Sequence, residues 1–165
     1  MLQVTGLGDT GAGGGFTMRT ISGGALVQDK DWNPIDTSAW KVVTKRAPTD
    51  DERRTMVFAS RAVKHVRSNA LVLAKGTRTI AIGGGQTARV DASWLAVHKA
   101  GENAKGACMA SDAFFPFADA VEVAAQAGVT SIVQPGGSIR DAEVVTTADR
   151  HGIAMVFTGR RSFRH

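Results

Sequence analysis

The sequence contains no tyrosine and a single cysteine, and it has no long apolar run. The lone cysteine, Cys108, cannot form a disulfide within the chain, which favours a reducing, cytoplasmic location. No apolar run approaches the ~20 residues that a membrane helix needs, so no membrane association is expected. The N-terminus carries Asp9 and no apolar block, so it does not read as a signal peptide. The spacing of His, Cys, Asp and Glu does not predict a zinc site.

The positive charge is spread along the chain rather than concentrated. The formal net charge is +5, and the basic residues fall in several short groups. Aromatic residues do not alternate with these groups, which disfavours a stacking platform for single-stranded nucleic acid. A basic RNA-binding domain is therefore the weakest of the functional classes considered. Arginines near glycine-rich turns fit a small phosphorylated ligand at least as well.

The order of predicted elements indicates an α/β fold. Residues 1–18 are rich in glycine and are predicted to form a flexible leader, and residues 19–165 are predicted to form one domain. Strands and helices alternate in the second half, which predicts βαβ units and a sheet covered by helices. The predicted strands lie at 24–29, 41–44, 70–74, 79–82, 106–111, 130–134 and 153–157.

Helix boundaries have local signals. Thr49 and Glu52 form a T-x-x-E capping box, and Ser138 and Asp141 suggest a second one. After the first box, apolar residues recur at helical spacing at 56, 59, 63 and 66, which predicts the buried face of that helix. A later helix is predicted to present Val90, Trp94 and Val97 on one face.

Two glycine patterns resemble a dinucleotide fingerprint. The pattern at 6–11 opens no helix, so we interpret it as accidental. The pattern at 83–88 follows a strand and opens a helix, but no acidic residue stands ~20 residues later to hold a ribose. This second segment is therefore interpreted as a phosphate or substrate loop and not as a Rossmann site.

Three loops follow predicted parallel strands and carry aromatic and cationic residues. Their sequences are SDAFFPF at 111–117, QPGGSIRD at 134–141 and TGRRSFRH at 158–165. In open α/β sheets the carboxyl ends of the strands are where ligands bind, so the three loops are expected to form one site. By contrast, Lys64-His65 resembles an acid–base pair, yet helical phase places His65 away from the buried face.

Long ordered motifs resemble the bifunctional AICAR formyltransferase and IMP cyclohydrolase family. They are RTISGGALVQD, VRSNALVLAK, IGGGQTARVD, KGACMASDAFFPF, QPGGSIRD and HGIAMVFTGRRSFRH, which together cover residues 19–165. The resemblance implies a cytidine-deaminase-like three-layer α/β/α sandwich without zinc. It further implies transfer of a formyl group from 10-formyltetrahydrofolate to AICAR ribonucleotide, in a homodimer. This chain resembles the second subdomain of the formyltransferase half.

The resemblance also implies roles for individual residues. Asn69 is expected to act on the carboxamide or on the transferring formyl group. Arg89, Phe114 and Arg161 are expected to bind the nucleotide, with Phe114 stacking on the imidazole and Arg161 holding the phosphate. The residues expected to line the folate side are Val90, Pro116, Phe117 and Asp119, and those expected to touch a structural potassium ion are Ser68 and Asp112.

One part of the family pattern is missing from the chain. The family's catalytic Lys-His pair lies in the first subdomain, in a segment with a following Pro and Gly, and nothing here matches that segment. Lys64-His65 is followed by VRSNA, so the catalytic role is not transferred to it. The cyclohydrolase domain is missing as well. We therefore expect the chain to be inactive alone, and a non-catalytic nucleotide- or folate-binding module is the alternative.

Overall fold

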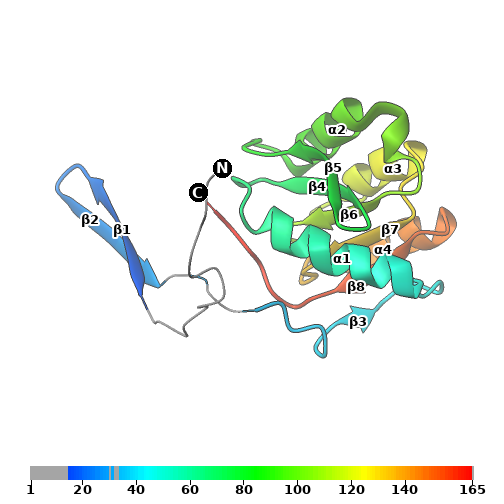
Figure 1. The fold of residues 1–165 in the computed structure, drawn as a ribbon, viewed down its shortest axis with the longest axis horizontal. Coiled ribbons are helices and arrows are strands. Elements are labelled where there is room, and N and C mark those ends of the chain that lie inside the picture. The colour runs from blue at the N-terminus through cyan, green and yellow to red at the C-terminus, as the bar shows by residue number, and fades with distance from the viewer. Residues whose placement is uncertain (1–14, 30, 32–33, 165) are drawn as a thin grey trace, which may run out of the picture. The chain divides into compact units, whose positions relative to one another are not determined.

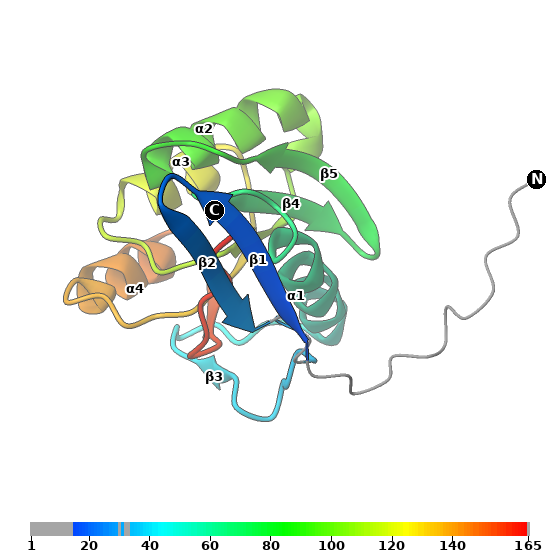
Figure 2. The ribbon, with the colours of Figure 1, turned by 90° about the vertical axis from the view of Figure 1, so that its left-hand side faces the viewer.

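A computed structural model describes residues 15–29, 31 and 34–164. The chain divides into two compact units, residues 1–34 and residues 35–165. The first unit contains an antiparallel hairpin of β1 (Phe16–Ile21) and β2 (Gly24–Asp29), visible in Figure 2. Strand β2 matches the strand predicted at 24–29. Strand β1 begins inside the segment predicted as a leader, and residues 1–14 of that segment lie outside the described residues.

The second unit is built on a six-stranded sheet, shown in Figure 1. Its elements in chain order are β3 (Lys41–Val42), α1 (Asp50–Val63), β4 (Leu71–Lys75), β5 (Arg78–Gly83), α2 (Arg89–Ala100), the 3-10 helix η1 (Gly101–Ala104), β6 (Cys108–Ser111), α3 (Asp119–Gln126), β7 (Ser131–Gln134), α4 (Asp141–Arg150) and β8 (Ala154–Phe157). The strands lie in the order β3-β8-β7-β6-β4-β5. The predicted alternation of strands and helices is confirmed.

The strand directions bring distant segments to one end of the sheet. Strands β6, β7 and β8 are parallel, so the loops that follow them share an end, which we call the carboxyl end of the sheet. Strand β4 is antiparallel to β6, and Leu71 at its start pairs with Ser111 at the end of β6. Strand β5 ends at Gly83, which also pairs with Leu71. The segments before β4 and after β5 therefore join the three loops at this end.

Helices cover both faces of the sheet and create two cores. Strand β4 is buried on both sides, with Leu71 and Leu73 in one core and Val72 and Ala74 in the other. The first core is shared with α2, α3 and α4, and the second is shared with α1. In Figure 2, α2 and α1 lie on opposite sides of β4 and β5. The expected three layers, α/β/α, are present. Within the described part of the chain, no helix combines the length and the apolarity required to cross a bilayer.

Helix α1 follows its sequence signals. The Thr49 side chain accepts a hydrogen bond from the Glu52 backbone N–H, and the Glu52 carboxylate accepts one from the Thr49 N–H. Met56, Ala59 and Val63 are buried against the sheet. The predicted capping box is confirmed, and so is the predicted buried face at the three positions within α1, because both depend only on residues within one or two turns. Val66, the fourth predicted position, lies beyond the end of the helix and packs partly against the same core.

The face of helix α2 that packs most closely on the sheet is not the one on which Val90, Trp94 and Val97 were predicted to lie together. Trp94 is 56% exposed and stacks on the His98 ring, with the ring centroids 4.8 Å apart. The buried side chains are mostly small: Arg89, Ala92, Ser93, Ala96 and Ala100. The reason is close approach, since a Cβ added to Gly83 would lie 2.0 Å from the Ala92 carbonyl oxygen. A helix backbone this close to β5 leaves room only for small side chains at the point of contact, and Val97 packs partly against the same core beside it.

The second predicted capping box does not form. Helix α4 begins at Asp141, and its N-cap residue is Arg140, which makes no capping hydrogen bond with its side chain. The Ser138 hydroxyl accepts instead from the Arg140 N–H, and the Asp141 carboxylate accepts from the Gly137 N–H. Gly137 has a φ of 95°. The turn that this glycine permits bends the chain before the helix and redirects both polar side chains.

Cys108 is buried in the second core, and it provides a pH test of the fold. Burial raises the pKa of its thiol from 9.0 to about 12. The unfolded chain ionises this thiol at a lower pH than the folded chain does, so this contribution to stability is complete below pH 9.0 and is lost as the pH rises toward 12.

We expect the free energy of unfolding to fall with pH more steeply in the wild-type chain than in Cys108→Ala. Between pH 9 and pH 11 the difference in slope should be about 1.4 kcal/mol per pH unit, the value for one titrating group. Urea unfolding at several pH values measures both slopes, and other groups that titrate contribute equally to each. Equal slopes in the two chains would show that the thiol has the same pKa in the folded and the unfolded chain.

Candidate functional site

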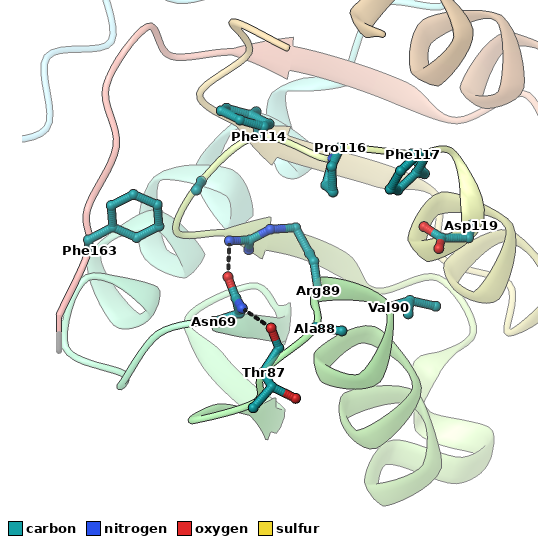
Figure 3. A pocket seen from close by; sticks show the side chains of 11 residues that line it. Asn69, Thr87, Ala88, Arg89, Val90, Phe114, Pro116, Phe117, Asp119 and Phe163 are labelled. Atoms are coloured by element: carbon teal, nitrogen blue, oxygen red, sulfur yellow. Dashed lines mark hydrogen bonds between the residues drawn. The ribbon is translucent and has the colours of Figure 1, made fainter. Parts of the chain in front are cut away.

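A pocket of about 380 Å³ opens at the carboxyl end of the sheet. It is lined by Asn69, Thr87, Ala88, Arg89, Val90, Ala113, Phe114, Pro116, Phe117, Asp119 and Phe163. In Figure 3, the row from Phe114 to Asp119 forms one side, and the segment from Thr87 to Val90 lies opposite with Asn69. Phe163, from the C-terminal segment, stands at one end.

The structure brings the predicted site residues together from four parts of the chain. Seven of them line the pocket: Asn69, Arg89, Val90, Phe114, Pro116, Phe117 and Asp119. The eighth, Arg161, lies with its guanidinium carbon 5.3 Å from the centre of the Phe114 ring. Ser68 and Asp112 lie behind the pocket, where they bond to each other. Sequence reasoning missed Phe163, although it is the one aromatic residue in the arginine-rich tail.

The three phenylalanines of the FFPF loop divide between core and pocket. Phe115 is fully buried, whereas Phe114 and Phe117 line the pocket. An arginine from a neighbouring loop lies over each pocket ring: Arg161 over Phe114, and Arg140 at 4.8 Å over Phe117. A cation over an aromatic face is attracted by the ring quadrupole. The pocket therefore combines flat apolar surfaces with positive charge, which suits an anionic ligand that contains a planar ring.

Arg89 is a buried cation held by a buried anion. Its side chain is 5% exposed, and Nη1 lies 2.6 Å from Asp112 Oδ1, whose side chain is fully buried. Nη1 also donates to Ser111 Oγ at 2.7 Å, and Nη2 donates to Asn69 Oδ1 at 2.8 Å. Among the described residues, no acceptor is found for Nε–H or for the second hydrogen on Nη2. Those two donors remain for a ligand.

The Asn69 amide is fully engaged as a donor in this structure. Its Nδ2 donates to the carbonyl oxygens of Gln86 and Thr87, both at 3.0 Å. Its Oδ1 accepts from Arg89. Asn69 thus ties the loop before α2 to the buried arginine. Donation from this amide to a reacting group stays a prediction, and it requires one of the two bonds to the loop to open.

Ser68 and Asp112 fit a potassium ion only in part. Both supply oxygen, the donor that hard cations prefer. However, the Asp112 carboxylate already accepts from Arg89, a cation, through Oδ1 and from Ser68 Oγ at 2.5 Å through Oδ2. A second cation at the same carboxylate would be repelled by the guanidinium. The potassium role remains a prediction.

His65 lies just past the end of α1, and its side chain is exposed. Its placement away from the buried face, as predicted from helical phase, is confirmed. Its backbone contacts the C-terminal segment, because its carbonyl oxygen accepts from Arg164 Nη1 at 2.8 Å. No lysine or histidine lines the pocket within the described part of the chain.

The His65→Ala variant is expected to unfold at nearly the wild-type urea concentration. The free energy of unfolding should change by no more than about 0.5 kcal/mol, as for other surface substitutions, because the contact with Arg164 uses the carbonyl group. Met56→Ala, in the same region but fully buried, is the matched control and should lose about 2–5 kcal/mol. A large loss in His65→Ala would mean that the imidazole is packed.

These observations define an α/β protein with a ligand site at the carboxyl end of its sheet. Sequence comparison names the family: the chain belongs to the AICARFT/IMPCHase bienzyme family, which it matches over residues 2–99. The bifunctional purine biosynthesis protein PurH of Bartonella bacilliformis is 54% identical over 162 residues. PurH of Chloroflexus aurantiacus is 58% identical over 153 residues, and that of Anoxybacillus flavithermus is 57% identical over 146 residues.

The chain spans only part of these relatives. The alignments cover 92%, 91% and 88% of this chain but 30%, 30% and 29% of the respective relatives. The match therefore establishes the family, and the activity of the whole protein has to be argued for this chain from its own site. A structure of Acinetobacter baumannii RibD aligns at a TM-score of 0.45 with 20% identity, over 64% of this chain and 33% of that one. Similarity at this level supports no assignment.

Proposed function

We propose that this chain forms the substrate-holding part of an AICAR formyltransferase of purine biosynthesis. In this proposal the pocket receives AICAR ribonucleotide and the formyl-bearing end of 10-formyltetrahydrofolate. The observation that carries it is the convergence of Asn69, Arg89 and Phe114 in one pocket, with the Arg161 guanidinium over the Phe114 ring. These residues come from four separate segments, and their chemistry matches the parts of one nucleotide.

Each part of the nucleotide has a partner of fitting chemistry. The Phe114 ring offers an aromatic face to the imidazole. Arg89 offers Nε–H and one hydrogen of Nη2 to the carboxamide or the ribose. Arg161 is exposed and cationic, and its forked guanidinium suits a phosphate. From both sides of the pocket, Val90, Pro116, Phe117 and Asp119 are proposed to receive the folate.

The proposed reaction moves one formyl group between two nitrogens. The amine of the nucleotide attacks the formyl carbon, the bond from that carbon to N10 of the folate breaks, the amine loses a proton and N10 gains one. Negative charge develops on the formyl oxygen in the tetrahedral intermediate, where a positioned donor lowers the barrier. Asn69 is the proposed donor. The proton transfer is assigned to a Lys-His pair in another part of the enzyme.

The wider properties of the family remain proposals for this chain. We propose a cytidine-deaminase-like fold without zinc, a homodimeric enzyme with sites near the subunit interface, and a cytoplasmic location. A potassium ion at Ser68 and Asp112 belongs to the same set, and no step above depends on it.

Arg161→Ala is expected to weaken binding of AICAR ribonucleotide by about 1.5–3 kcal/mol, the contribution of a hydrogen bond to a charged group. In an enzyme of full family length that carries this segment, turnover at saturating nucleotide should change much less. Isothermal titration calorimetry measures the first quantity, and initial rates measure the second.

Arg160→Ala, the neighbouring substitution of the same size and charge, is the matched control and should bind within a few-fold of wild type. An equal loss of binding free energy in both variants would mean that only the general positive charge of the tail matters. Unchanged binding by Arg161→Ala would contradict the proposed contact between Arg161 and the phosphate.

A further inference from the structure

The C-terminal segment 160–164 has no secondary structure of its own, yet it supplies two groups to the pocket. Phe163 stands at one end of the pocket, and Arg161 lies over Phe114. Arg161 and Arg164 are exposed and Phe163 is 46% exposed, so apolar burial holds this segment only weakly. Hydrogen bonds and the contact of Arg161 with the Phe114 ring are therefore important for its position.

Those hydrogen bonds reach three residues, which are His65, Ser68 and Asp112, and the bond to the His65 carbonyl is the one from Arg164 Nη1 described above. The Ser68 N–H donates to the Arg164 carbonyl at 2.8 Å, and the Arg164 N–H donates to Ser68 Oγ at 3.1 Å. The Ser162 N–H donates to the Asp112 carbonyl at 2.8 Å. Ser68 Oγ, in turn, donates to Asp112 Oδ2 at 2.5 Å. One hydroxyl thus accepts from the tail and donates to the buried carboxylate.

The same carboxylate also sets Arg89. Asp112 Oδ1 accepts from Arg89 Nη1, while Oδ2 accepts from Ser68. The Asp112 carboxylate therefore contributes both to the orientation of Arg89 and, through Ser68, to the position of the tail. A ligand that contacts Arg89 and Arg161 together would require both to be set at once.

We propose that Ser68 is a positioning residue, which latches the C-terminal segment to Asp112 and so holds Phe163 and Arg161 at the pocket. Its relevance to nucleotide binding rests on the proposed function, whereas the latch itself does not. Ser68 does not line the pocket, so it acts through the residues that it holds.

Amide hydrogen exchange of the 165-residue chain, followed by NMR, tests the latch. In Ser68→Ala, the Arg164 amide should exchange roughly tenfold faster or more, because it loses the Ser68 hydroxyl as its acceptor. The Ser162 amide donates to the main-chain carbonyl of Asp112, so its exchange should rise only as far as the whole tail loosens. Ser68→Thr keeps the hydroxyl and should restore slow exchange. Ser93→Ala is the control, since it removes a buried hydroxyl that donates to the Ala120 carbonyl at 2.9 Å.

The proposal is upheld if exchange rises at the tail in Ser68→Ala alone while the amides of Ile132 and Val133 in β7 stay protected. It is overturned if the wild-type tail shows no protection, if Ser68→Ala leaves the tail unchanged, or if Ser68→Thr fails to restore it. It is also overturned if Ser93→Ala loosens the tail equally.

A titration with AICAR ribonucleotide separates the latch from the function. Ser68→Ala should bind the nucleotide at least several-fold more weakly than Ser68→Thr. If the exchange results hold and the wild-type chain binds no nucleotide, the proposed function fails and the latch stands. If nucleotide binds equally well to both variants while the tail exchanges freely in Ser68→Ala, the latch has no part in positioning and the inference is overturned.

Discussion

Supplied with AICAR ribonucleotide and 10-formyltetrahydrofolate, the 165-residue chain is expected to show no enzyme-like turnover. General acid–base catalysis contributes roughly 10²–10⁴-fold, and its most frequent donor, histidine, does not line the pocket in the described part of the chain. Arg89 and Asp119 are the only titratable residues among those that line it in the described part of the chain. The guanidinium does not release a proton at neutral pH.

The measurement is chromatographic detection of the formylated nucleotide. The control is the same chain mixed with the first formyltransferase subdomain of a PurH protein, where a gain of activity would show that the missing group comes from that part. Normal turnover by the pure chain would contradict the proposed division of labour and would return His65 to consideration as the base.

Asp112→Ala is expected to lower the free energy of unfolding by about 3–5 kcal/mol. Removing one partner of a buried ion pair leaves the other charge buried without compensation, and that charge would be Arg89, whose side chain is only 5% exposed. Ser68 would lose its acceptor at the same time. Urea unfolding, followed by circular dichroism, measures the change.

A double variant identifies the cause. Asp112→Ala combined with Arg89→Met removes both charges and replaces the guanidinium with a flexible apolar chain, so it should regain much of the lost stability. A single variant that loses less than about 1 kcal/mol would mean that water reaches Arg89 and that the pair is not buried in solution. If the double variant is no more stable than Asp112→Ala, the lost stability comes from other contacts of Asp112 and not from the unpaired charge of Arg89.

The parts of the fold that sequence predicts well are those specified locally. The capping box of Thr49 and Glu52 and the buried face of α1 involve residues within two turns, and both are present. The face of α2 that packs on the sheet could not be predicted from the apolar spacing of the helix, because it is set by the close approach of the helix backbone to Gly83 in β5. The second capping box failed for a similar reason, since the turn at Gly137 determines where Ser138 points.

For the site, too, the sequence indicated which residues take part but not how they contact one another. Family motifs and loop chemistry placed Phe114 and Arg89 in one site, and the structure places both in one pocket. The engagement of Asn69 with the loop carbonyls was not predictable, because it depends on the meeting of segments on either side of the β4–β5 hairpin. Phe163 was missed because its place depends on hydrogen bonds between the tail and His65, Ser68 and Asp112, which are far away in the sequence.

The central claim is that this pocket holds the nucleotide, and NMR titration of the isotope-labelled chain with AICAR ribonucleotide tests it directly. We predict saturable shift changes confined to the neighbourhood of Asn69, Arg89, Phe114 and Arg161, with Trp94 on the outer face of α2 unaffected. Saturable changes centred elsewhere on the domain would contradict the claim, as would full occupancy by the nucleotide without any change at Phe114 and Arg161.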